Sequence, residues 1–302
     1  FPYTTLFRSH TLRAAGVELR AALPVGLLRG IAGRADLRLH RKIIAIDGRI
    51  AWTGSMNMVD PRFFKQDAGV GEWVDAMVRI EGPVAGVLAA VMISDWVAEG
   101  GDNLDKVLAE TALAPTPAEG SVPVQVLASG PGESGDGLIQ IMLALISAAR
   151  QEVVLTTPYF VPEDALVTAL RGAAARGVKV IVVLPRRIDS LLVRHASRSF
   201  FDEVISAGCE IHEFRGGLLH TKSITIDGEQ AMFGTANFDM RSLWLNYEVS
   251  LLVFDKDFVT DLRALQQGYL NESDAVMLVP WDKRPMGTRL VESTMRLLTP
   301  LL

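Results

Sequence analysis

Cysteine is almost absent from this chain, and its basic residues form no block. The single cysteine, Cys209, excludes a disulfide framework and any zinc site built on several cysteines. The formal net charge of −5 argues against a dedicated nucleic-acid-binding protein, because such proteins present a basic face. No apolar run approaches the ~20 residues that a membrane-spanning helix needs. The longest runs, 86–93 and 139–149, are typical of buried core helices.

What is present is the composition of a folded protein. Hydrophobic residues make up 49% of the 302 residues and charged residues 22%, which excludes a disordered chain and leaves room for two domains or lobes. The chain does not begin with Met, and residues 1–9 (FPYTTLFRS) resemble the in-frame translation of a sequencing adapter. We therefore interpret residues 1–9 as a cloning or assembly scar and expect the natural protein to extend further upstream.

The chain contains an internal repeat. One pattern occurs twice with every spacing preserved. It begins with His-x-Lys, continues after four further residues with Asp-Gly, and ends with Gly-Ser/Thr-x-Asn. The second copy stands 180 residues after the first (220 against 40), and this repetition indicates two related lobes. The first copy supplies His40, Lys42, Asp47, Ser55 and Asn57, and the second supplies His220, Lys222, Asp227, Thr235 and Asn237.

Each copy predicts a β-hairpin. Alternating isoleucines run into Asp-Gly, a strong hairpin signal, and a second strand follows. Side chains two residues apart on a strand share a face, so the histidine and the lysine of each motif should point together. Asp47 and Asp227 are grouped with the catalytic residues as members of the motif. Because they precede the turn glycines, we expect them to fix the hairpin and lobe geometry.

The segments before the second copy predict an α/β fold. Between residues 124 and 214, segments typical of strands alternate with segments typical of helices, which indicates a mixed or largely parallel sheet flanked by helices. Strands are expected at 124–127, 153–156, 178–184 and 210–214, and helices at 138–150, 163–176 and 190–207.

The first lobe is expected to be incomplete. Only 39 residues precede His40, whereas the second copy uses 96 residues from 124 to 220. Residues 101–122 are rich in Ala, Pro, Thr and Gly and follow a predicted helix at 84–99, which is typical of a linker. The chain should then comprise the C-terminal part of a first lobe (10–100), a linker (101–122) and a pseudo-symmetric second lobe (123–302).

The repeated residues suit a site for one phosphodiester, provided that the two lobes meet across a pseudo-twofold axis. A neutral histidine can attack phosphorus, and a charged one can protonate a leaving alkoxide. Lys42 and Lys222 would neutralise the phosphate oxygens, while Asn57 and Asn237 would donate amide hydrogen bonds. Two ammonium groups make a metal unnecessary, so we predict neither a metal nor any other cofactor.

Each histidine needs a partner that orients its far ring nitrogen. Glu248 and Asp75 are the candidates, because each follows the asparagine of its motif and stands one residue before an apolar strand. We expect the pairs His220–Glu248 and His40–Asp75, while the opposite assignment of the two carboxylates stays open. Ser55 and Thr235 complete the residues predicted to bind or orient the substrate.

The repeated motif resembles that of the phospholipase D superfamily. Further segments resemble the bacterial cardiolipin synthases with two motifs and a membrane anchor, and this similarity covers residues 10–302. The segments include PRFFKQD at 61–67, TPYFVP at 157–162, GGLLH at 216–220 and MRSLWLN at 240–246.

The resemblance implies a transphosphatidylation. A motif histidine would attack one phosphatidylglycerol, releasing glycerol and leaving a phosphatidyl-histidine, and a second phosphatidylglycerol would resolve this intermediate to cardiolipin. In relatives the histidine of the first motif is often the nucleophile, which points to His40, with His220 as acid and base. The resemblance also implies an anionic phospholipid as partner, no nucleic acid, and N-terminal transmembrane helices that are not visible in this sequence. The full-length protein would lie in the bacterial inner membrane.

Two other functions are compatible with the same motifs. A phospholipase D-type hydrolase, acting on lipid or on nucleic acid, would use water as acceptor after an identical first step. A catalytically dead lipid-binding fragment would keep the fold without turnover, since an incomplete first lobe could leave the site poorly formed. The products formed from phosphatidylglycerol distinguish these possibilities.

Overall fold

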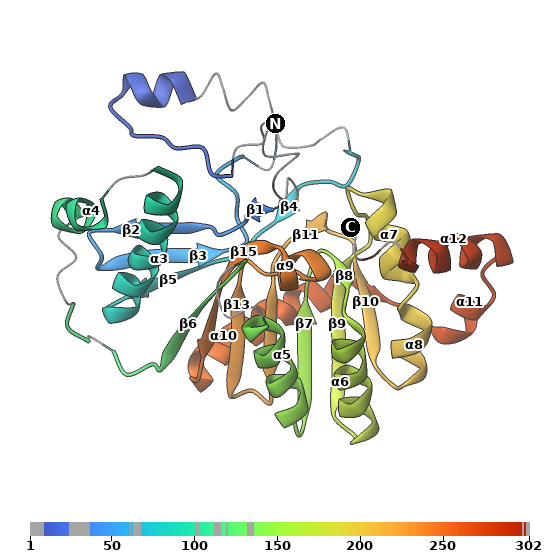
Figure 1. Cartoon of the computed structure of the whole chain (residues 1–302). Coiled ribbons are helices and arrows are strands. Elements are labelled where there is room, and N and C mark those ends of the chain that lie inside the picture. The colour runs from blue at the N-terminus through green and yellow to red at the C-terminus, as the bar shows by residue number, and fades with distance from the viewer. Residues whose placement is uncertain are drawn as a thin grey trace.

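The computed structural model describes residues 9–23, 37–60, 62, 68–100, 103–111, 116–118, 120–131, 136–297 and 299. The predicted scar at 1–9 lies outside the described residues except for Ser9, and so does the PRFFKQD segment except for Arg62. Figure 1 shows one large sheet with helices on both faces and a smaller sheet beside it. This arrangement confirms the predicted mixed α/β fold.

The large sheet is mixed, and only part of it is parallel. Its strand order is β1-β15-β13-β12-β7-β9-β10-β16, and β6 pairs with β15 outside this path. Strands β7, β9 and β10 are parallel to one another, as are β1 and β15, while the remaining neighbours are antiparallel. The strands are β1 (Arg38–Leu39), β6 (Val124–Ser129), β7 (Glu152–Thr156), β9 (Lys179–Pro185), β10 (Glu210–Phe214), β12 (Ser223–Ile226), β13 (Gln230–Gly234), β15 (Asn246–Val253) and β16 (Ser273–Ala275).

Helices cover both faces of this sheet because its central strands are apolar on both sides. In β9, Val180 and Val182 belong to the main core cluster, while Ile181 and Val183 pack on the opposite face with Tyr269. The helices are α5 (Gly137–Ala148), α6 (Asp164–Ala175), α7 (Leu191–Arg198), α8 (Phe201–Ser206), α9 (Met240–Trp244), α10 (Lys256–Asn271), α11 (Leu278–Asp282) and α12 (Met286–Leu297). The single helix predicted at 190–207 is wrong, since α7 ends before the buried Phe200 and α8 begins after it.

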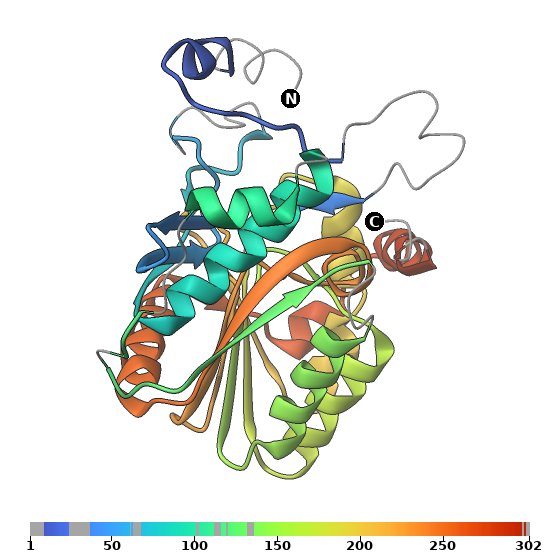
Figure 2. The ribbon, with the colours of Figure 1, turned by 60° about the vertical axis from the view of Figure 1, so that its left-hand side comes forward.

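The described residues before 101, which we call the first lobe, form a small antiparallel sheet covered by a long helix, and we call the described residues from 123 onward the second lobe. Strands β2 (Ile43–Ile46), β3 (Ile50–Gly54) and β5 (Met77–Glu81) of the small sheet pair in that order, which confirms the predicted hairpin. Helix α3 (Pro83–Gly100) crosses this sheet, as Figure 2 shows, and α4 (Leu104–Thr111) follows within the predicted linker. Ala85 and Leu88 of α3 form a core cluster with Val249 and Leu251 of β15, so apolar packing joins the two lobes.

Helix α3 is the one described helix whose length and composition would allow it to cross a membrane. Only 22% of its apolar window is buried. Its buried residues, Ala85, Leu88, Ala89 and Ile93, recur at helical spacing and mark the face that packs on the small sheet.

Two short ladders complete the fold. Strand β11 (Leu218–Leu219) pairs in parallel with β4 (Trp73–Val74), and β14 (Phe238–Asp239) pairs in parallel with β8 (Phe160–Val161). The first of these joins the two lobes, as does the β1–β15 ladder.

Arg41 joins the lobes through a buried guanidinium whose side chain is 3% exposed. It donates to Asp95 of α3 at 2.6 Å, to the carbonyl of Glu248 at 3.0 Å and to the carbonyl of Ser129 at 3.1 Å. Removing one partner of a buried ion pair leaves the other uncompensated. Arg41→Leu should therefore lower the free energy of unfolding by about 3 kcal/mol, as measured by urea denaturation.

The matched control is Arg79→Leu, which removes an exposed arginine paired with Glu81 on β5. Exposed ion pairs contribute about 0–1 kcal/mol. Equal losses in the two variants would contradict the role of Arg41 between the lobes.

Candidate active site

The two motif histidines are positioned by ladders that cross between the lobes. His40 follows β1, which runs beside β15 of the second lobe, and the His40 N–H donates to the carbonyl of Tyr247 at 2.9 Å. His220 follows β11, which runs beside β4 of the first lobe, and the His220 N–H donates to the carbonyl of Val74 at 2.9 Å. The same backbone contact is thus made twice, in symmetric positions.

Each histidine is paired with a carboxylate from the other lobe. His40 Nδ1 lies 2.8 and 2.9 Å from the two carboxylate oxygens of Glu248, and His220 Nδ1 lies 2.6 Å from Asp75 Oδ1. The pairs expected from the sequence, His220–Glu248 and His40–Asp75, are therefore wrong. The parallel ladders pair Leu39 with Tyr247 and Leu219 with Val74, so the next residue on each strand meets the next residue on its neighbour.

Glu248 is completely buried and is held by three side chains besides His40. Thr235 Oγ1 donates to it at 2.5 Å, Ser242 Oγ at 2.9 Å and Asn246 Nδ2 at 3.2 Å. Ser242 is placed by α9, whose N-cap Asp239 accepts from the Ser242 N–H at 2.8 Å. The sequence analysis missed Ser242 and Asn246 as site residues. Asn246 could have been found, because it stands two residues before Glu248 on one strand and shares its face.

Asp75 has a matching but simpler environment. Ser55 Oγ donates to Asp75 Oδ1 at 2.7 Å and also accepts from the N–H of Ala76 at 3.0 Å. Ser55 and Thr235 occupy the same position in the two motifs, so each motif hydroxyl holds the carboxylate of its own lobe. That carboxylate in turn orients the histidine of the other lobe.

Lys222 lies buried and Lys42 half-buried, each beside the histidine of its own motif. Lys42 Nζ and Lys222 Nζ each donate to the carbonyl of the histidine two residues earlier, at 2.7 Å in both motifs. Burial lowers the pKa of Lys42 to about 8, although Glu248 and Asp75 attract its charge. Burial and the charge of Lys42 lower the pKa of Lys222 as well. The protein thus disfavours the charged forms of both lysines, and an anionic group bound at the site would favour them.

The two histidines differ in exposure. The side chain of His40 is 25% exposed and that of His220 is 4% exposed, with the Trp73 ring centroid 4.4 Å from the His220 ring. Burial, reinforced by the charge of Lys222, lowers the pKa of His220 to about 3. His220 is thus neutral near pH 7 in the free protein. Its partner Asp75 is ionised there, because hydrogen bonds from His220 and Ser55, together with the charge of Lys222, outweigh burial and lower the carboxyl pKa.

The motif asparagines have unequal surroundings. Asn237 is buried, and its N–H donates to Ser242 Oγ at 3.1 Å, whereas its Oδ1 has no hydrogen-bond partner among the described residues. Asn57 is partly exposed. The buried Asn237 amide thus retains hydrogen-bonding capacity at the site.

Asp47 and Asp227 lie in the hairpin turns, at the far ends of β2 and β12 from the histidines. Their φ angles of 53° and 54° are in the left-handed region that tight turns require. Asp227 accepts from the N–H groups of Arg150, Gln151 and Glu152 at 2.7–2.9 Å, which ties its turn to the start of β7. Five residue steps, or ~17 Å of extended chain, separate Asp227 from Lys222. These contacts fit the structural role that its turn position predicts.

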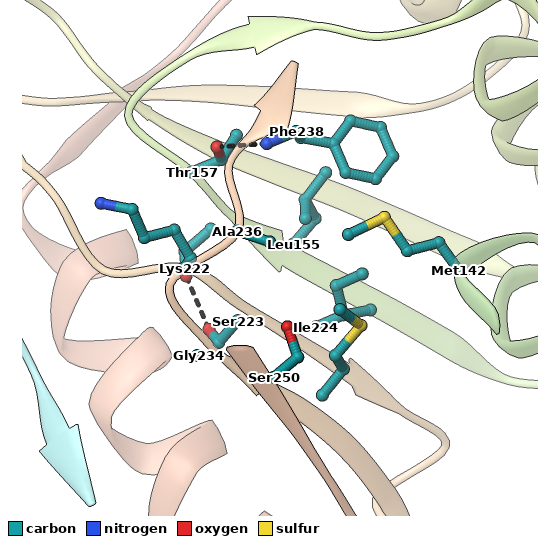
Figure 3. Close-up of a pocket in the computed structure, with 12 residues that line it drawn as sticks. Met142, Leu155, Thr157, Lys222, Ser223, Ile224, Gly234, Ala236, Phe238 and Ser250 are labelled. Atoms are coloured by element: carbon teal, nitrogen blue, oxygen red, sulfur yellow. Dashed lines mark hydrogen bonds between the residues drawn. The ribbon is translucent and has the colours of Figure 1, made fainter. Parts of the chain in front are cut away.

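The space beneath Lys222 is too small for a substrate. Figure 3 shows this pocket, in which Thr157 Oγ1 accepts from the Phe238 N–H at 3.1 Å, and the Lys222 side chain points away from Met142 and Leu155. Its volume is about 10 Å³, room for about one water molecule. In the described part of the chain, no group of three or more His, Cys, Asp or Glu residues could hold a metal ion. The absence of a cofactor stays a prediction.

The chain is similar to several known proteins. A family model described as "Cardiolipin synthase, PLD-like domain" matches residues 142–267. The chain is 48% identical to cardiolipin synthase A of Pectobacterium carotovorum subsp. carotovorum (strain PC1), over 98% of this chain and 62% of that protein. It is 46% identical to cardiolipin synthase A of Yersinia pseudotuberculosis serotype O:1b (strain IP 31758), over 100% of this chain and 61% of that protein. The chain thus spans about three fifths of the length of these relatives.

A solved structure supports the fold alone. The phosphatidylserine synthase of Haemophilus influenzae Rd KW20 is similar with a TM-score of 0.66 and 16% sequence identity, over 88% of this chain and 72% of that chain.

Proposed function

We propose that the protein transfers a phosphatidyl group from one phosphatidylglycerol to another and releases glycerol. The match of residues 142–267 to the family model described as "Cardiolipin synthase, PLD-like domain" and the 48% identity to a cardiolipin synthase A support this proposal. The observation that carries this proposal is the crossed pairing of the two histidines. Both Nδ1 atoms are occupied by carboxylates, so both Nε2 atoms are left for chemistry, and the side chains of Lys42 and Lys222 lie in the same site.

In the first step, His40 Nε2 attacks the phosphorus of one phosphatidylglycerol. The N–P bond forms, the P–O bond to glycerol breaks, and the departing oxygen takes a proton from His220. His220 acquires that proton when the substrate binds, because a phosphodiester anion nearby favours the charged form of the ring. Glu248, held by its hydrogen bonds to Thr235, Ser242 and Asn246, stabilises the charge that develops on His40.

In the second step, His220 removes the proton from the terminal hydroxyl of a second phosphatidylglycerol. The oxygen attacks phosphorus, the N–P bond to His40 breaks, and cardiolipin leaves. Neutral His220 is the form that this step needs, and its lowered pKa supplies it. Lys42 and Lys222 neutralise the phosphate oxygens in both steps.

The products formed from phosphatidylglycerol vesicles test this function. We expect cardiolipin and glycerol in equal amounts, with neither product formed by His220→Asn. Phosphatidic acid with glycerol but without cardiolipin would assign the site to hydrolysis. Trapping at low pH followed by peptide mass spectrometry should place the phosphatidyl group on the peptide containing His40, and an adduct on His220 would reverse the roles of the two rings.

The lowered pKa of Lys42 predicts an alkaline limit to activity. The lysine is charged below pH ~8 and loses its charge above it, so kcat/KM, which reports ionisations of the free enzyme, should fall about tenfold per pH unit above that value. Lys42→Arg should be slower at pH 7 because the guanidinium has a different shape, yet its alkaline limb should move beyond pH 9. An alkaline limb at the same pH in both proteins would contradict the role of Lys42.

A further inference from the structure

An open cavity of about 650 Å³ lies beside the segments that deliver His220 and Asp75. Its lining contains three arginines and no acidic residue, and the rest of the lining is apolar side chains and glycines. The lining residues are Val70, Gly71, Arg186, Arg187, Phe214, Arg215, Gly216 and Gly217. None of the three arginines belongs to the repeated motif.

The fold brings these arginines to one edge of the sheet. Arg186 follows β9 and Arg215 follows β10, and these parallel neighbours pair Pro185 with Phe214 at their carboxyl ends. The Arg186 N–H donates to the carbonyl of Phe214 at 2.9 Å. This hydrogen bond joins the carboxyl ends of β9 and β10. The carboxyl edge of parallel strands is where α/β sheets bind their ligands.

Two glycine-containing segments of the cavity lining lead along the chain toward the reactive groups. Gly217 leads into β11, and His220 follows three residues later, a reach of ~10 Å along an extended chain. Gly71 leads into β4 and Asp75 in the same way. A Cβ on Gly217 would stand 2.3 Å from the carbonyl oxygen of Glu72, so only glycine lets these two segments touch.

The arginines are only partly neutralised by their neighbours. Arg186 pairs with Asp274 at 2.9 Å, and Arg215 contacts the same Asp274 at 3.5 Å and the carbonyl of Glu272 at 3.1 Å. Arg187 donates to the carbonyl of Gly69 at 3.2 Å. One carboxylate is thus shared by two guanidinium groups, and the third contacts an uncharged oxygen. All three arginines are exposed and can receive an anion from solvent or from a lipid surface.

We propose that this cavity binds the phosphodiester of the acceptor phospholipid, so that its terminal hydroxyl reaches His220. The proposal rests on the proposed function, in which two phosphodiesters take part in each cycle. Lys42 and Lys222 neutralise the one that reacts, and the other needs cationic groups near enough for the acceptor's terminal hydroxyl to reach His220. Guanidinium groups suit this task because they bind phosphate oxygens through paired hydrogen bonds.

The test measures the ratio of cardiolipin, the product of transfer, to phosphatidic acid, the product of hydrolysis. Arg187→Gln/Arg215→Gln should lower cardiolipin formation from phosphatidylglycerol vesicles by about 10–100-fold, the effect of losing hydrogen bonds to a charged group. Glycerol release should fall much less, and phosphatidic acid should take a larger share of the product, because water replaces the poorly bound acceptor. Arg187→Lys/Arg215→Lys should retain more transfer than the glutamine variant.

Three controls make the result decisive. Arg289→Gln removes an exposed arginine of α12 and should leave the product ratio unchanged. Equal thermal midpoints for the wild type and the double glutamine variant show that the fold is intact. Inorganic phosphate at millimolar concentration should not change the wild-type product ratio, whereas a change matching that of the double variant would identify a site for free phosphate and overturn the assignment to lipid.

A product ratio unaffected by the double substitution would also overturn the proposal. Failure of the proposed function looks different, because the wild type itself would then release glycerol without forming cardiolipin, or release none at all.

Discussion

Glu248→Gln is expected to lower kcat by about 10³–10⁴-fold, the range seen when the carboxylate that orients a catalytic histidine becomes an amide. Glu248 is fully buried and accepts hydrogen bonds from Thr235, Ser242 and Asn246 while holding His40. A glutamine keeps the volume but must turn an NH₂ group toward one of these donors. It also removes the negative charge that stabilises a charged His40. Steady-state assays on phosphatidylglycerol vesicles measure the effect, and KM should change much less than kcat.

Glu292→Gln is the matched control for this substitution. Glu292 is 2% exposed and pairs with Arg284 and Arg198 in the α7–α12 region, away from the motifs. Its amide should lower the thermal midpoint and leave kcat nearly unchanged. Asp75→Asn should resemble Glu248→Gln, because Asp75 holds His220 in the symmetric position. A kcat for Glu248→Gln within threefold of the wild type would remove Glu248 from the site.

Lys222→Met is expected to lower kcat/KM by about 10³-fold and to raise the thermal midpoint. The loss of activity follows from removing an ammonium group that faces the phosphate in the transition state, where one such donor contributes 10²–10³-fold or more. The gain in stability follows from burial, which opposes the charged form of Lys222 and lowers its pKa. Methionine has a similar volume and no charge, so the variant should be about 1 kcal/mol more stable at pH 7.

The stability that Lys222→Met gains over the wild type should decrease as the pH rises. Between the lowered pKa of Lys222 and its usual value of 10.5, the unfolded chain binds the proton and the folded chain does not. Wild-type stability therefore rises with pH across this window, and the advantage of the methionine variant should shrink. Differential scanning calorimetry at pH 7 and pH 9.5 measures both proteins. A lower midpoint for Lys222→Met at pH 7 would show that the hydrogen bond to the His220 carbonyl outweighs the burial of the charge.

The sequence predicted local structure well, because each hairpin is specified by neighbouring residues. The isoleucine alternation and the Asp-Gly turns locate both hairpins, and the position of Asp227 before its glycine predicts the structural role that its three backbone hydrogen bonds now explain. The presence of a carboxylate beside each histidine also followed from the strand pattern. The break between α7 and α8 did not, because the buried Phe200 continues the apolar pattern of a single helix.

The crossed pairs and the arginine cavity depend on contacts between distant segments. Ladders of two residues each, β1 with β15 and β4 with β11, decide which carboxylate meets which histidine. Two-residue strands carry no periodicity from which their partners could be inferred. Arg186 and Arg215 come together only through the β9–β10 register, and nothing near either residue in the sequence indicates the other.

The central claim is that both lobes build one phosphatidyl-transfer site around His40 and His220. The most direct test expresses the chain in a bacterium that lacks cardiolipin, both alone and joined to the part of a cardiolipin synthase A that the chain does not span. Lipids are measured by mass spectrometry, with His220→Asn as control. The account predicts cardiolipin with the intact histidine and none with the variant. Equal cardiolipin with both proteins, or none with either although the wild-type protein is folded and membrane-bound, would contradict it.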